Sequence, residues 1–151
     1  MQDIQTSRVY HWEDSLPLSH TGIFSQRRCS MKRCKELIAE ACQLYKVKQV
    51  QVRLPRNPKQ SYAGYYDRDK VIILPLKYHQ QDVALHEVAH HITVNYWPRS
   101  SEHGEIFVRV YMHLMSKLLE IDISYLEMWA KLYKVKFSKS ERYSPAYACL
   151  N

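Results

Sequence analysis

The sequence contains few glycines, prolines and cysteines, the residues that make a chain flexible, break regular structure or cross-link it. Three glycines and six prolines in 151 residues exclude a collagen-like or linker-dominated protein. The composition, 46% hydrophobic and 25% charged, instead matches a single globular domain. The four cysteines are irregularly spaced and form no CxxC pair. We therefore expect free thiols in a reducing compartment, with neither a disulfide framework nor a cysteine zinc site.

Long apolar runs are also lacking. No stretch approaches the ~18 consecutive apolar residues that cross a bilayer. The N-terminal residues are partly acidic and lack the apolar stretch that is typical of a signal peptide. We therefore expect a cytoplasmic protein that does not have a membrane as a partner.

Charge is unevenly distributed along the chain, whose formal net charge is +7. Two basic segments, residues 27–59 and 131–142, flank a mildly acidic middle. Basic segments can contact phosphates without reading sequence, so one interpretation is non-specific nucleic-acid binding. The other interpretation is a solvated basic face that binds nothing in particular. No helix-turn-helix, zinc-finger or RNP pattern supports the first interpretation.

Apolar periodicity predicts an α+β domain between two flanking segments. We place an N-terminal arm at 1–25, the domain at 26–136 and a C-terminal tail at 137–151. Helices are predicted at about 30–46, 80–96 and 102–120, and from Ser124, which with Glu127 makes a capping-box pattern. Strands are predicted at 47–54 and in a hairpin at 61–75, with a further short strand at 8–12 in an otherwise irregular arm. We expect a small, three-stranded, mainly antiparallel sheet with helices on one face.

The most informative segment is HEVAHH, residues 86–91, inside a predicted helix. His86 and His90 are four residues apart, so both imidazoles project from one helix face and can reach one Zn²⁺ at about 2.0–2.1 Å. Glu87 lies beside the pair, where it can act as a general base without being a ligand. The alternatives are a hydrogen-bonded pair of core histidines, or a site that no longer binds metal.

A catalytic zinc needs a third protein ligand and an open position for water. His103 is the favoured third ligand, because it shares the inward face of the next predicted helix with Phe107. Gly104 beside it would permit close backbone approach. Glu102 and Glu105 are rival ligands, since a carboxylate can also bind zinc.

Two further histidines fit the same metal poorly. His91 is rotated by about 100° from His90 on a helix, so we expect it to pack or to hydrogen-bond nearby. His113 is nearly in phase with His103 but lies well along the helix axis, which disfavours a role beside the metal.

These motifs resemble the zincin metallopeptidases, and within them the SprT-like (Spartan-type) group. HEVAH at 86–90 is followed by HGEIF at 103–107, and the hairpin at 61–75 is similar to the strands that precede the active helix in that group. The Arg8-Val9-Tyr10 segment and the HE-x-AHH pattern resemble still more closely a small set of metallohydrolases of bacteriophages and actinobacteria. The resemblance covers roughly residues 8–120. It implies a zincin-like (minimal metalloprotease) domain with one catalytic Zn²⁺.

The sequence departs from these families in two respects. It lacks the C-terminal cysteine zinc ribbon of many SprT-like proteins, which weakens any inference of DNA-dependent proteolysis. It also lacks the HExxHxxGxxH spacing of the metzincins, which excludes that branch.

Together these features predict a zinc-dependent metallopeptidase that hydrolyses peptide bonds. We expect His86, His90 and His103 to bind the zinc and Glu87 to act as general base on a metal-activated water. The alternatives are a zinc hydrolase of non-peptide amides, and a non-catalytic nucleic-acid- or partner-binding module with a structural zinc.

The predicted strand at Ser61–Tyr66 could pair with an extended protein or peptide substrate. Its tyrosines, Tyr62, Tyr65 and Tyr66, could line the cleft or stabilise the oxyanion. The alternative is that they simply alternate between core and surface.

Overall fold

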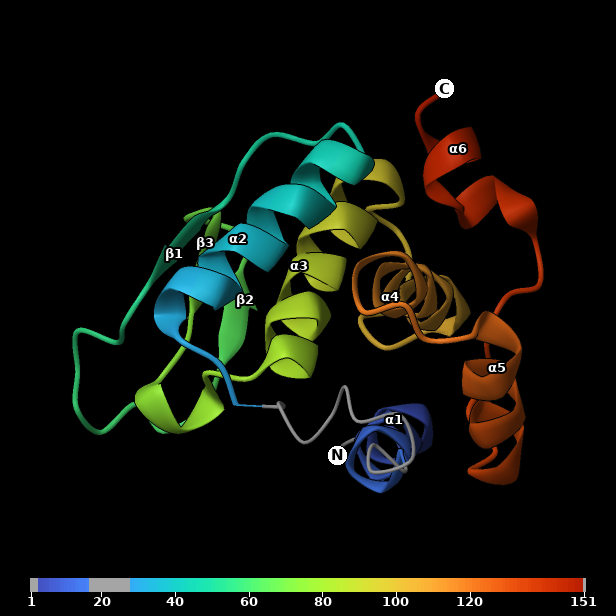
Figure 1. Ribbon diagram of the computed structural model, residues 1–151, viewed down its shortest axis with the longest axis horizontal. Coiled ribbons are helices and arrows are strands. Elements are labelled where there is room, and N and C mark those ends of the chain that lie inside the picture. The colour runs from blue at the N-terminus through green and yellow to red at the C-terminus, as the bar shows by residue number, and fades with distance from the viewer. Residues whose placement is uncertain (1–2, 17–27, 151) are drawn as a thin grey trace.

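The computed structural model describes residues 3–16 and 28–150 of the chain (Figure 1). This part has the predicted α+β character, and no helix in it is long and apolar enough to cross a bilayer. Its helices are α1 (Ile4–Ser15), α2 (Met31–Leu44), α3 (Gln81–Tyr96), α4 (Glu105–Leu118), α5 (Ile123–Leu132) and α6 (Pro145–Ala148). Its strands are β1 (Gln51–Arg53), β2 (Gly64–Tyr66) and β3 (Val71–Ile73), and its 3-10 turns are η2 (Leu76–Tyr78) and η3 (Glu141–Tyr143).

Helix α3 is the centre of the helical core, packed against α2 on one side and α4 on the other. Helix α2 confirms the prediction from its apolar periodicity. It begins after Ser30, whose hydroxyl accepts a hydrogen bond from the Arg33 N–H at 3.1 Å, and its buried face includes Cys34, Leu37 and Ala41. Figure 1 shows α2, α3 and the sheet in one half of the molecule, with α4, α5 and α6 in the other.

The sheet has three strands in the order β1-β3-β2. The predicted hairpin is confirmed, because β2 and β3 pair antiparallel, but β1 pairs with β3 in parallel. The prediction of a mainly antiparallel sheet is therefore wrong, and the sheet is mixed. After β1 the chain crosses to the opposite edge before forming β2, so β3 returns between them in the direction of β1. Central β3 is buried throughout, whereas β2 lies at an edge.

The predicted irregular arm contains a regular helix. Residues 4–15 form α1, so the strand predicted at 8–12 is wrong, while residues 17–25 of the arm lie outside the described residues. Asp3 caps the helix by accepting a hydrogen bond from the Gln5 N–H at 2.8 Å. Val9, Trp12 and Leu16 are buried at helical spacing. The other face of α1 is polar, which is why no simple apolar pattern marked the helix.

The last third of the chain differs from its prediction at helix ends and in the tail. His103 lies in the turn before α4, and Asp122 rather than Ser124 caps α5. The predicted tail includes η3 and α6, and it buries Tyr143 and Ala148. The predicted domain limits stay a prediction, although buried residues lie on both sides of them.

Candidate metal centre

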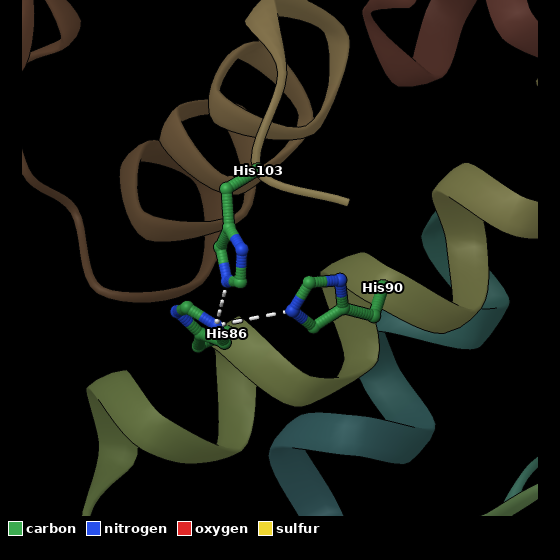
Figure 2. A group of neighbouring side chains, drawn as sticks. All are labelled: His86, His90 and His103. Carbon is green, nitrogen blue, oxygen red and sulfur yellow. Dashed lines mark hydrogen bonds between the residues drawn. The ribbon is translucent and has the colours of Figure 1, made fainter. Parts of the chain in front are cut away.

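Two turns of α3 and the loop before α4 bring three histidines together. His86 and His90 project from one face of α3, as their four-residue spacing predicts. His103 enters from the turn that precedes α4, and Figure 2 shows the three rings pointing toward one another. Gly104 permits this turn, because a Cβ at that position would lie 3.1 Å from the Ser101 Cβ and 3.2 Å from its carbonyl oxygen. His86 and His103 are buried, and His90 is half-buried.

The distances between the ring nitrogens suit a shared metal ion. The Nε2 atom of His86 lies 3.1 Å from that of His90 and 3.2 Å from that of His103 (Figure 2). The ligand atoms of the three residues all lie within 4.8 Å of one another, and no other group of this kind occurs among the described residues. Imidazole nitrogen is a preferred donor for zinc, copper, iron and nickel. The three histidines can therefore hold one metal ion.

Burial and neighbouring charge set the protonation of the three rings. Burial and the adjacent histidines hold the pKa of His90 well below its usual range, and burial with the nearby His86 lowers the pKa of His103 to about 4. Burial opposes charge on His86 as well, but the carboxylates around it, Glu13 above all and then Glu87 and Asp82, together outweigh burial and raise the pKa of His86 to about 9. His90 and His103 are thus neutral at physiological pH, as metal ligands must be.

An aromatic wall supports the rings from the α4 side. The ring of Phe107 stacks on His90 with centroids 4.3 Å apart, and its centroid lies 5.0 Å from those of both His86 and His103. Phe107 is fully buried, so it holds the three imidazoles against a fixed surface. The inward-facing position predicted for Phe107 is confirmed.

Glu87, the predicted general base, lies beside the histidines. Its side chain is 7% exposed, and burial raises the pKa of its carboxyl group, whereas His86 and the Tyr65 backbone N–H lower it. Two cavities, of about 340 and 620 Å³, adjoin Glu87 and share Tyr10, Ala63, His86 and Glu87 as lining residues. His86 and Glu87 therefore border both cavities, and the smaller one is lined by all three histidines and by Gly64 and Tyr65 of β2.

The three predicted substrate tyrosines have different surroundings. Tyr62 lines the larger cavity, and Tyr65 lines the smaller one while its hydroxyl donates to Asp67 at 2.9 Å. Tyr66 lines neither of these cavities, and its hydroxyl accepts a hydrogen bond from Gln60 at 2.8 Å. The cleft thus has Tyr62 and Tyr65 on its wall.

The rival metal ligands do not join the cluster. Glu102 lines the smaller cavity and Glu105 is exposed, but neither belongs to the three-residue group of ligand atoms. His91 donates through Nε2 to the Lys48 carbonyl at 2.8 Å, and so has the separate hydrogen-bonding role predicted for it. His113 lines a different cavity.

Sequence reasoning missed the contribution of α1 to the site. Glu13 accepts a hydrogen bond from Nδ1 of His86 at 2.5 Å, and Thr6 Oγ1 lies 3.4 Å from Nδ1 of His103. Tyr10 stacks on His86 with ring centroids 5.8 Å apart. A helical reading of the arm would have placed these three residues on one face, since they lie four and three residues apart.

The basic segments show partial internal pairing. On α2, Lys32 lies 4.0 Å from Glu36, and Arg33 lies 3.3 Å from Glu40. Arg27, the first basic residue of the segment at 27–59, lies outside the described residues. Nucleic-acid binding stays a prediction.

Comparison with known proteins gives no relative. No protein-family model matches the chain, and there is no significant match among curated proteins or solved structures. The function must therefore be argued from the site alone.

Proposed function

We propose that this protein is a zinc-dependent metallopeptidase. The observation that carries the proposal is the convergence of three Nε2 atoms, 3.1–3.2 Å apart around His86, beside the carboxyl group of Glu87 in an open cleft. A structural zinc needs four protein ligands and no cleft, whereas a catalytic zinc takes three and leaves a position for water. The three-histidine cluster fits the catalytic arrangement.

The roles of the residues follow from their positions. His86, His90 and His103 would hold the ion. When bound, zinc acidifies water and polarises a carbonyl group. Glu87, in the cleft and next to His86, accepts the proton of the attacking water and delivers it to the leaving amine. Its burial suits this exchange, since a raised pKa makes the carboxylate a better proton acceptor.

The shape of the cleft favours an extended peptide over a small amide. The cavities extend to both sides of His86 and Glu87, so a chain could continue in both directions from the bond that is cleaved. Strand β2 forms one edge of the sheet, and Ala63, Gly64 and Tyr65 line the smaller cavity. An extended peptide can add to such an edge through main-chain hydrogen bonds.

The test combines metal analysis with an activity assay. We expect one zinc per chain after purification in zinc-containing buffer, and loss of that zinc in His86→Ala, His90→Ala and His103→Ala. Glu87→Gln should keep the zinc and lose about 10²–10⁴-fold in the cleavage of a denatured-protein or peptide-library substrate. Glu105→Gln is the matched control, because this exposed glutamate lies near the site but outside the cluster, and it should keep both zinc and activity.

Other outcomes would overturn parts of the proposal. Absence of zinc from the parent protein would contradict the proposed metal centre. Unchanged cleavage by Glu87→Gln would show that Glu87 is not the general base. Hydrolysis of small amides without any peptide cleavage would make the enzyme an amide hydrolase, and zinc binding without turnover of either class would favour a binding module.

A further inference from the structure

One face of α1 is turned toward the histidines instead of the apolar core. Thr6, Tyr10 and Glu13 lie four and three residues apart, and each contacts a histidine of the cluster. A neighbouring face, about a quarter turn around the helix, carries Val9 and Trp12, both fully buried. Helix α1 therefore has two packed faces, one on the core and one on the metal centre.

The contact between Glu13 and His86 fixes the chemical state of the ring. The carboxylate accepts from Nδ1 at 2.5 Å, and the two side chains are 13% and 6% exposed. The Nδ1–H group donates to Glu13, so when metal binding releases the other ring proton of His86, Nε2 presents its lone pair toward His90 and His103. A carboxylate in this position also makes the imidazole more electron-rich and limits its rotation.

The neighbouring contacts restrain the same assembly. Tyr10 lies nearly parallel to His86, at an interplanar angle of 13°, and its ring centroid is 5.3 Å from that of His103. Thr6 Oγ1 lies 3.4 Å from Nδ1 of His103. Side chains of this one helix therefore contact Nδ1 of two of the three histidines, His86 and His103.

Helix α1 is held in place independently of these contacts. Gln5 makes two hydrogen bonds with the backbone of Lys136, at 2.8 and 3.1 Å, and Arg8 donates to the Lys134 carbonyl at 3.3 Å. Together with buried Val9 and Trp12, these bonds anchor the helix. A change at Glu13 should therefore alter the site without releasing α1.

We propose that α1 forms the outer shell of the metal centre and that Glu13 is the positioning residue for His86. This inference rests on the proposed metal centre but not on peptidase activity. The helix supplies no ligand itself. Glu13 presents Nε2 of His86 to the metal in the correct tautomer and orientation, and removal of such a partner typically weakens metal binding about 10–100-fold.

The experiment measures zinc affinity by competition with a chromophoric chelator, for the full chain and three variants. We expect about 10–100-fold weaker binding in Glu13→Ala and a smaller loss in Glu13→Gln, whose amide oxygen can still accept from Nδ1. Asp14→Asn is the matched control, because it removes the same charge from the adjacent, exposed position of α1. It should bind zinc within about twofold of the parent. The visible spectrum of the cobalt-substituted proteins should change in Glu13→Ala and not in Asp14→Asn.

Thermal unfolding in the presence of a chelator shows whether each variant keeps its fold. Glu13→Ala and Glu13→Gln proteins that fold and match the Asp14→Asn control in affinity and cobalt spectrum would overturn the positioning role while leaving the metal centre intact. A parent protein that binds no zinc would overturn both proposals. Weakened zinc binding without any peptidase activity would support the inference and contradict only the proposed function.

Discussion

His113 is a buried histidine that lies outside the three-histidine cluster. It is 6% exposed, and its Nε2 atom has no hydrogen-bond partner among the described residues. Burial lowers the pKa of His113 to about 4, and the positive charges of Arg109 and Lys117 act in the same direction, against the opposing charge of Glu127. A neutral His113 is therefore part of the folded state at physiological pH.

We expect His113 to make stability depend on pH below about 6.5. The unfolded chain protonates this side chain near its ordinary pKa of about 6.5, whereas the folded chain resists protonation until about pH 4. Stability is thus lost as the pH falls through this window, by about 2 kcal/mol between pH 7.5 and pH 5. The measurement is urea unfolding of the parent and of His113→Gln at both pH values, with a chelator present.

Comparing the parent with His113→Gln separates the contribution of His113 from those of the other seven histidines. Every other histidine is present in both proteins, so its contribution cancels in the difference between their pH dependences. His113→Gln should lose about 2 kcal/mol less than the parent on acidification. Equal losses in the two proteins would show that His113 titrates normally in the folded state.

Residue spacing predicted the three-histidine cluster but not the residue that supports it. His86 and His90 could be paired from their four-residue separation, and His103 from its place at the start of the next element. The bond between Glu13 and His86 spans 73 residues. No local pattern encodes such a contact, because it depends on where α1 docks in three dimensions.

Among the helices, α5 shows how two capping signals can compete. The carboxylate of Asp122 accepts from the backbone N–H groups of Ser124 at 2.7 Å and Tyr125 at 3.3 Å. The predicted capping box assigned this role to Ser124 with Glu127, but Glu127 accepts a hydrogen bond from Arg109 at 2.5 Å. The helix thus begins two residues earlier than predicted, and Glu127 binds Arg109 of α4 instead of capping the helix.

This assignment predicts unequal effects of two alanine substitutions. Asp122→Ala should lower the free energy of unfolding by about 0.5–2 kcal/mol, because it leaves two N–H groups of the first turn without their acceptor. Ser124 lies inside the first turn, so Ser124→Ala should change the free energy of unfolding by less than about 0.5 kcal/mol. Urea unfolding at neutral pH measures both. The reverse order would restore Ser124 as the cap.

A helix that buries a single apolar face could be predicted from the sequence. A helix that packs on the core with one face and on the histidines with another could not. Helix α2 was predicted from its apolar stripe, and α3 from its helical pattern and from Pro98, which follows it. Helix α1 was missed because the face that contacts the histidines is polar, so Val9 and Trp12 alone make only a narrow apolar stripe beside it. The parallel pairing of β1 was missed for a different reason: strand order depends on where the chain crosses the sheet, and periodicity within a strand carries no such information.

At the scale of the whole molecule, both flanking segments of the predicted domain pack on its core. Helix α1 contacts α5, and Gln5 exchanges hydrogen bonds with the backbone of Lys136. At the other end, the Tyr45 hydroxyl donates to the Tyr143 carbonyl at 2.9 Å, and Tyr143 packs edge-on against Trp97. These contacts cross the limits 26–136 that apolar periodicity predicted.

The predicted limits can be tested by truncation. A fragment of residues 26–136 should be at least about 3 kcal/mol less stable than the full chain, because it loses the buried side chains of Val9, Trp12 and Tyr143. Urea unfolding followed by circular dichroism measures this difference, and separate removal of 1–25 and of 137–151 apportions it between the two ends. A fragment that unfolds cooperatively within about 1 kcal/mol of the full chain would instead show that residues 26–136 fold as an independent domain. The flanking segments would then bear on the metal centre only through Thr6, Tyr10 and Glu13, and truncation would weaken zinc binding while leaving stability intact.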